Sequence, residues 1–199
     1  MVFIMEIKDS GTRREFESGA VRDVTEGKGR CDLLPLDCIS QILNDDNILY
    51  CMNEFCFEGG THHLAKAFSI FVQKHCGDKY TTILEVAKHY EEGAKKYAER
   101  NWQKGIPLHC YIDSAVRHYL KFLRGDTDEP HHRAFLWNIL GAMWTTDHLP
   151  EMIDLPFIDN PDATLGCKHR EWFGDFNMNV CNKNGKECND MANCKERTI

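Results

Sequence analysis

The chain has 199 residues, 42% of them hydrophobic, and a formal net charge of -7, which together predict one globular domain with extensions or at most two small domains. The acidic balance argues against a nucleic-acid polymer as partner, since such binding needs many lysines and arginines, whereas a single nucleotide needs few. No apolar run approaches the ~18 residues of a membrane span, and Glu6 interrupts the opening MVFIM too early for a signal peptide. We therefore expect a cytoplasmic protein that contacts no membrane.

Three regions follow one another along the chain. Residues 1–32 are polar and rich in glycine, without helical or strand periodicity, so we expect a loop held in order by other residues, or disorder. Residues 33–150 carry apolar residues at helical spacing between glycine and proline turns, and residues 44–60 are interpreted as a connection with room for a short helix. Residues 151–199 are turn-rich and rich in cysteine. The pattern predicts an all-α helical bundle with an ordered N-terminal segment and an irregular C-terminal extension.

The segment ILEVAKHYEEGAKKYAER, residues 83–100, is predicted to form a long helix. A projection at about 100° per residue places Val86 and Tyr90 on an apolar arc, with Glu91 beside that arc and Glu92 on the opposite side. Glu91 is therefore predicted to face inward. The alternative interpretation is a surface ion pair between Glu91 and Lys95, four residues apart.

The next helix, CYIDSAVRHYLKFLR at residues 110–124, repeats this arrangement. Asp113, Arg117 and Arg124 follow one border of its apolar arc, whereas His118 is predicted to face away. An ion pair between Asp113 and Arg117 on the helix surface is again the alternative.

The segment HHRAFLWNILGAMWTT, residues 131–146, is predicted to form a further helix, whose apolar face continues backward to His132 and Glu129. Asp128 lies close by, although a helix N-terminus favours acidic residues in any case. Carboxylates at the rim of a core cost several kcal/mol each unless a cation meets them. Mg²⁺ or Mn²⁺ would meet several at once, and Mn²⁺ also accepts imidazole. We therefore expect a divalent metal ion where these acidic residues meet.

These segments, together with SGAVRDVTEGKGRCDLLP near the N-terminus, resemble the phage-type dATP/dGTP diphosphohydrolase N-terminal domain family, relatives of the MazG-like nucleotide pyrophosphohydrolases. The resemblance extends over residues 10–150. It implies a MazG-like helical bundle and metal-dependent cleavage of a purine deoxynucleoside triphosphate to the monophosphate and pyrophosphate. It also implies a phage-encoded protein of the host cytoplasm that forms a homodimer or homotetramer.

The same resemblance assigns roles to individual residues. Glu91, Asp128 and Glu129 would be catalytic, and together with His132 they would hold the metal. Substrate contacts would come from the N-terminal segment, from the two helices and from the turn after the first of them: Arg22, Lys28, Arg30, Lys95, Lys96, Asn101, Trp102, Arg117 and Arg124. Solvent exposure of the N-terminal segment and a plain hydrophobic role for Trp102 are the alternatives.

One feature departs from the better-known MazG pattern. The motif E-E-x-x-E followed by E-x-x-D is not met, because Lys95 follows Glu91-Glu92 and His132 follows Glu129 at the corresponding positions. This leaves open a second hypothesis, a protein that captures a nucleotide or signalling nucleotide without cleaving it. A third is a structural oligomer with vestigial acids.

Four of the ten cysteines lie in the C-terminal extension. A structural zinc site there is a weak hypothesis, because no C-x-x-C pair is present, and a disulfide-bonded or unstructured tail is the alternative. The candidate ligands are Cys167, His169, Cys181, Cys188 and Cys194. The other six cysteines are expected to be small, buried or half-buried thiols.

Overall fold

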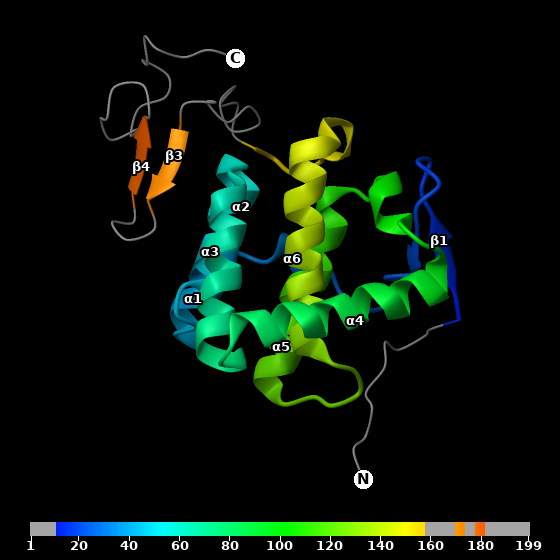
Figure 1. Cartoon of the computed structure of the whole chain (residues 1–199), viewed down its shortest axis with the longest axis horizontal. Coiled ribbons are helices and arrows are strands. Elements are labelled where there is room, and N and C mark those ends of the chain that lie inside the picture. Colours follow the sequence, from blue (N-terminus) through cyan, green and yellow to red (C-terminus); the bar gives the residue numbers. More distant parts are fainter. Residues whose placement is uncertain (1–10, 158–169, 174–177, 182–199) are drawn as a thin grey trace.

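The computed structural model describes residues 11–157, 170–173 and 178–181 (Figure 1). Its elements, where η marks a short 3-10 or π helix, are β1 (Arg13–Glu15), β2 (Val21–Asp23), η1 (Cys31–Leu33), α1 (Leu36–Leu43), α2 (Ile48–Glu58), α3 (Thr61–Phe71), η2 (Val72–Cys76), α4 (Lys79–Tyr97), η3 (Asn101–Lys104), α5 (Leu108–Arg124), α6 (His131–His148), η4 (Pro150–Met152), β3 (Arg170–Phe173) and β4 (Met178–Cys181). Helices dominate, so the predicted all-α class is confirmed.

Helix α6 is the centre of the bundle. It packs along α5 and also contacts α3 and α4, and Figure 1 shows α4 crossing it. Phe135, Leu136, Ile139 and Ala142 are fully buried and share one face of α6, about 120° wide. The rings of Phe71, Tyr119 and Phe135 pack together at 4.7 to 6.0 Å between centroids. Burial of these aromatic side chains contributes most of the driving force that fixes α3, α5 and α6 together.

Local sequence sets the ends of the helices around this centre. The carboxylate of Asp78 accepts a hydrogen bond from the backbone N–H of Thr81 at 2.7 Å and so caps the start of α4. Gly125 ends α5 in the left-handed conformation, with φ at 83°, which glycine adopts without steric cost. The turn from Gly125 to Pro130 then sends α6 back along α5.

Residues 48–58, in the segment expected to be a connection with room for a short helix, form the 11-residue helix α2. Its apolar residues surround the helix axis, so no amphipathic pattern marks it. The N-terminal segment contains the antiparallel hairpin β1–β2, in which Arg13 pairs with Asp23 and Glu15 with Val21. Because the strands are short and charged, they lack the alternation typical of a half-buried strand.

The described part of the C-terminal extension comprises residues 151–157 and the antiparallel pair β3–β4, so this region is not wholly irregular. Cys181 ends β4. The other candidate zinc ligands, Cys167, His169, Cys188 and Cys194, lie outside the described residues. Among the described helices, none is both long and apolar enough to cross a bilayer.

The crossing of α5 and α6 depends on Gly141. A Cβ atom at this position would lie 2.3 Å from the ring of Tyr111. Gly141→Ala should therefore force the helices apart and lower the free energy of unfolding by about 1–3 kcal/mol. Gly93→Ala is the matched control, since a Cβ there meets nothing within 4 Å and should raise it by about 0.5–1 kcal/mol. Urea unfolding measures both, and equal effects would contradict this view of the crossing.

Candidate functional site

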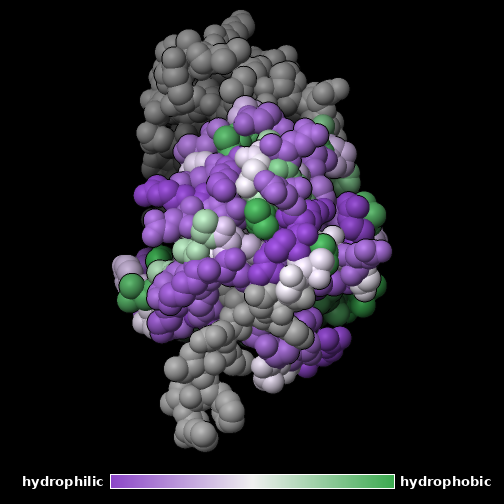
Figure 2. All heavy atoms as spheres, turned by 90° about the vertical axis from the view of Figure 1, so that its right-hand side faces the viewer, coloured by the Kyte–Doolittle hydropathy of each residue, from purple (hydrophilic) through white to green (hydrophobic). Residues whose placement is uncertain are grey.

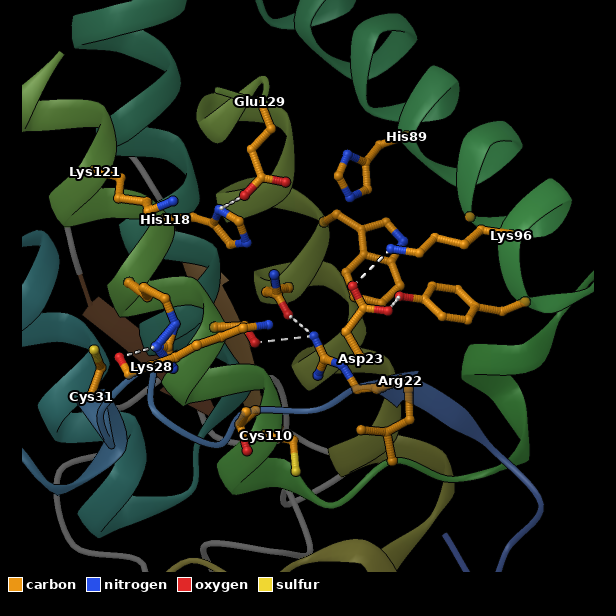
Figure 3. Close-up of a pocket in the computed structure, with 18 of the residues that line it drawn as sticks. Arg22, Asp23, Lys28, Cys31, His89, Lys96, Cys110, His118, Lys121 and Glu129 are labelled. Atoms are coloured by element: carbon orange, nitrogen blue, oxygen red, sulfur yellow. Dashed lines mark hydrogen bonds and ion pairs between the residues drawn. The ribbon is translucent and has the colours of Figure 1, made fainter. Parts of the chain in front are cut away.

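A cavity of about 720 Å³ lies between the N-terminal segment and helices α4, α5 and α6. Its volume is in the range of small-molecule sites in proteins. Figure 3 shows side chains from all four of these parts of the chain pointing into it. The outer face on the hairpin side is covered mostly by hydrophilic residues (Figure 2).

Arg22 joins strand β2 to the helices behind it. Its NH2 group donates to Asn138 Oδ1 at 2.9 Å and to Ser114 Oγ at 3.2 Å. The guanidinium also lies over the rings of Tyr111 and Trp137, at 5.2 and 5.6 Å from their centroids. Arg22 is thereby fixed at the cavity wall, between α5 and α6.

Asp23, the next residue, joins the hairpin to α4. Its carboxylate accepts hydrogen bonds from Lys96 Nζ and Tyr97 OH, both at 2.8 Å, and from Arg13 NH1 at 3.0 Å. Burial alone would raise the pKa of Asp23, but the hydrogen bonds from Lys96 and Tyr97 outweigh it and lower that pKa. Asp23 is therefore ionised, and its carboxylate holds the hairpin against α4.

Two further contacts hold residues 18–31 against the bundle. The Asn101 side chain accepts from the backbone N–H of Val21 at 2.9 Å and donates to its carbonyl at 2.8 Å, so it pairs with β2 as a neighbouring strand would. Asp113, which is buried, accepts from the backbone N–H of Cys31 at 2.6 Å and from Arg117. Arg117 also donates to the carbonyls of Lys28 and Gly29. The N-terminal segment is thus an ordered wall of the cavity.

The cavity is strongly cationic, in contrast to the acidic chain. Among the described residues that line it, seven side chains are Lys or Arg, and the carboxylates are Asp23 and Glu129. The cations are Arg14, Arg22, Lys28, Lys96, Arg117, Lys121 and Arg124. Such a concentration of positive charge favours an anionic ligand.

Buried nitrogen atoms at the cavity wall also lack partners. Nδ1 of His89 and NH1 of Arg22 have no hydrogen-bond partner among the described residues, although both atoms are buried. His89 is 7% exposed and projects from α4 into the cavity (Figure 3). Unpaired buried polar atoms are costly, so their presence at one cavity is consistent with a ligand that satisfies them.

A second feature of the cavity is a cluster of two imidazoles and a carboxylate. Nδ1 of His118 lies 3.0 Å from Nδ1 of His131, and Oε1 of Glu129 lies 3.5 and 3.7 Å from these two atoms. The three side chains can offer one ligand atom each within a single small sphere. This spacing fits the ligand atoms of one divalent ion. The donor set therefore fits a metal, but one that accepts nitrogen.

Asp128 supports this cluster from outside. Its carboxylate lies 2.8 Å from Nε2 of His131 and 3.0 Å from Nζ of Lys121. Burial would raise the pKa of Asp128, but the contacts with Lys121 and His131 outweigh it and lower that pKa far below its usual value. A carboxylate on the outer nitrogen of a histidine fixes the orientation of the ring.

His118 is neutral. Burial, followed by its interaction with His131, holds the pKa of His118 well below its usual value.

The prediction that Glu91 faces inward and Glu92 outward is wrong. Glu91 is 65% exposed and pairs with Lys95, as the alternative interpretation held. Glu92 contacts Arg133 of α6 at 3.0 Å and is 20% exposed. The apolar residues Ile83 and Leu84 that guided the projection are themselves exposed. The inward face of α4 instead carries polar residues, which hydrophobic periodicity cannot identify.

Two histidines were also assigned to the wrong sides of their helices. His131, not His132, is buried beside Glu129, because α6 begins at His131 directly after Pro130. Hydrophobic periodicity could not distinguish the two, since α6 is apolar on nearly all sides. His118, expected to face away, lines the cavity. Neither His118 nor His131 was among the predicted ligands, and their signal was the presence of histidine on both helices that flank the α5–α6 turn.

The structure brings together most of the predicted substrate contacts. Arg22, Lys28, Lys96, Asn101, Arg117 and Arg124 line the cavity, whereas Arg30, Lys95 and Trp102 do not. Arg30 pairs with Asp32, and Lys95 pairs with Glu91 on the surface. Trp102 packs edge-on against Tyr90 and Trp144. The tryptophan that lines the cavity is Trp137.

Fold and cavity together define an all-α protein with a cationic ligand site. Residues 79–154, which form α4, α5, α6 and the turns between them, match the family described as dATP/dGTP diphosphohydrolase, N-terminal. The predicted resemblance is thus confirmed over these residues. The matched range contains the His118–Glu129–His131 cluster and excludes the hairpin. No curated protein and no solved structure matched the chain.

The protonation state of His89 can be tested by measuring the free energy of unfolding as a function of pH. Burial, followed by the charge of Arg133, lowers the pKa of His89 to about 3. In the unfolded chain the pKa is about 6.5, so the unfolded state binds the proton first as the pH falls. This group should therefore destabilise the fold progressively from pH 6.5 towards pH 3, by up to about 1.4 kcal/mol per pH unit.

Urea unfolding of His89→Gln across this pH range should show a shallower loss of stability than the original chain. His148→Gln, on the exposed end of α6, is the control and should keep the original slope. An unchanged slope in His89→Gln would show that this imidazole is protonated in the folded protein.

Proposed function

We propose that the cavity binds a purine deoxynucleoside triphosphate, dATP or dGTP, and hydrolyses it to the monophosphate and pyrophosphate. The observation that carries this proposal is the cationic lining of a cavity in the part of the chain that matches the diphosphohydrolase family. The same resemblance supports a phage-encoded, cytoplasmic homo-oligomer as part of the proposal.

The cations on the cavity wall would bind the triphosphate. Lys28 and Lys121 lie on the side of the cavity near His118 (Figure 3), so they suit the phosphates next to the histidine cluster. A triphosphate carries several negative charges, and fixed cations in a partly enclosed site neutralise the charge that develops during phosphoryl cleavage. Arg22 and Lys96 line the side nearer the hairpin.

The base and sugar would lie against the less charged part of the wall. Val21, Tyr97, Ile106 and Trp137 contribute apolar and aromatic surface to the cavity. Aromatic side chains stack on nucleobases without requiring one particular base. The buried Nδ1 of His89, which lacks a partner among the described residues, offers a polar contact for a purine edge or a phosphate oxygen.

The metal would be held by His118, Glu129 and His131. A divalent ion at these three side chains would supply Lewis acidity towards the phosphate oxygens. Asp128 would hold the ring of His131 in the orientation that directs Nδ1 at the ion. Two nitrogens beside one carboxylate oxygen favour Mn²⁺ over Mg²⁺, because Mg²⁺ prefers oxygen ligands.

Capture without hydrolysis is the second candidate, and a specific observation favours it. The cavity wall is rich in cations but poor in acids that could bind a metal ion. Asp23 is hydrogen-bonded to Lys96 and Tyr97, so Glu129 is the carboxylate left for metal binding among the described lining residues. Incubation with each nucleoside triphosphate and Mn²⁺, followed by assays for pyrophosphate and for binding, separates the two. Stoichiometric binding without pyrophosphate release would support capture.

Glu129→Gln should lower kcat/KM for pyrophosphate release by about 100-fold or more, because it removes a carboxylate from the cluster at the cavity. Glu91→Gln is the matched control on α4 and should change kcat/KM by less than about 3-fold, since it alters an exposed ion pair. Steady-state kinetics with dATP and dGTP measures both. A large loss in Glu91→Gln would instead restore the original assignment of Glu91 and suggest that a second subunit completes the site.

Metal binding can be tested without turnover. Mn²⁺ should bind more tightly than Mg²⁺, and His118→Ala should raise the Kd for Mn²⁺ by at least about 10-fold. Isothermal titration and Mn²⁺ electron paramagnetic resonance measure this directly. His132→Ala is the control from the neighbouring position and should leave the Kd unchanged. Equal effects of the two substitutions would count against this ligand set.

A further inference from the structure

A different group of side chains lies at the other side of the cavity, around Cys110. This residue is in the first turn of α5, is 3% exposed, and lines the cavity. NH2 of Arg14 donates to its Sγ at 2.8 Å, and Nε2 of His109 lies 3.2 Å from the same sulfur. Two nitrogen atoms from separate parts of the chain therefore converge on one thiol.

Asp154 fixes the orientation of His109. The carboxylate accepts a hydrogen bond from the backbone N–H of His109 at 3.0 Å, and its other oxygen contacts Nδ1 of the ring. The hydrogen bond with Asp154, followed by that with Cys110, raises the pKa of His109 to about 10. The ring is therefore an imidazolium at neutral pH, with one N–H directed at Asp154 and the other at the sulfur.

Arg14 and His109 make the surroundings of this sulfur electropositive, which is the kind of environment in which reactive cysteines are found. The start of a helix adds to this effect, because its N-terminal dipole favours negative charge. The other described cysteines lack this combination. Burial raises the pKa of Cys56 to about 12, and burial also raises the pKa of Cys51 and Cys76. Cys38 is exposed, on α1.

We propose that Cys110 is a nucleophile and that the Cys110–His109–Asp154 group, with Arg14, forms a site of oxidation by small hydroperoxides. The site is separate from the histidine cluster, although Arg14 and Cys110 line the same cavity. A hydroperoxide is small enough to reach a sulfur that lies in a cavity wall. Its leaving group needs a proton, and His109 holds one beside the sulfur.

The reaction is balanced with hydrogen peroxide as the oxidant. The thiolate of Cys110 attacks one oxygen, an S–O bond forms, and the O–O bond breaks. The departing hydroxide takes the proton of His109 Nε2 and leaves as water, so that thiolate, peroxide and imidazolium give sulfenic acid, water and neutral imidazole. The sulfur is oxidised by two electrons, and the peroxide is reduced by two.

The test uses the whole chain, reduced and then exposed to hydrogen peroxide at pH 6.5 with dimedone to trap sulfenic acid. Peptide mass spectrometry follows the adduct at each cysteine. An ordinary thiol is about 1% ionised at this pH, so Cys110 should be trapped at least about 10-fold faster than Cys38. Trapping of Cys110 at or below the rate of Cys38 would overturn the proposal. This comparison lies within one folded protein and needs no nucleotide, so it does not depend on the proposed function.

Variants then test the roles of the neighbours. His109→Gln removes the proton donor, and Arg14→Gln removes the second cation, so each should slow trapping of Cys110 by at least about 5-fold while trapping of Cys38 stays unchanged. His148→Gln is the control for the loss of a histidine elsewhere. Circular dichroism and thermal unfolding establish that each variant is folded. Unchanged rates in both folded variants would show that these two cations do not activate the thiol.

Discussion

The hydrogen bond from Arg22 to Asn138 is the contact on which the cavity depends. It joins a three-residue strand to the central helix, and the side-chain amide of Asn138 is itself fixed by its bond to the carbonyl of Ala134 at 2.8 Å. The hairpin has too few apolar residues to be stable alone. Its order therefore comes from polar contacts with the helices, of which Arg22 and Asp23 make the central ones. Without them the cationic wall would lose one of its four sides.

This arrangement explains how an acidic chain can hold an anion. Acidic residues also occur around the cavity, but those on the hairpin and α5 are hydrogen-bonded to other parts of the protein. Asp23 is committed to Lys96 and Tyr97, and Asp113 to Arg117 and the backbone of Cys31. Arg22 and Lys28 then contribute positive charge to the cavity, whereas Arg124 is paired with Asp126. Net charge describes the whole surface, whereas binding depends on the local field.

The sequence predicted the helices and most of the cations, but not the inward acid of α4 or the histidines. Helix caps and helical spacing depend on local sequence, so the residues near Asp78 and Gly125 indicated where helices begin and end. Orientation of a helix depends on its neighbours. On α4 the exposed Ile83 and Leu84 shifted the projection towards Glu91, while Glu92 is held inward by a partner on another helix, Arg133. No local pattern in a single sequence reveals a partner that lies 41 residues away.

The placement of the histidine cluster follows from the same long-range packing. His118 lies on α5, Glu129 lies in the turn between α5 and α6, and His131 is the first residue of α6. The three side chains therefore come from one helical hairpin. Their mutual distances are therefore set by the crossing of α5 and α6, which the contact between Gly141 and Tyr111 keeps close. A site on rigid, closely packed helices can hold ligand atoms to within a fraction of an ångström. The hairpin is attached to the helices chiefly by polar side chains, although Ala20 is fully buried in the core and Phe16 packs against it. The histidine cluster is thus positioned by core packing, whereas the hairpin wall of the cavity is positioned largely by polar contacts.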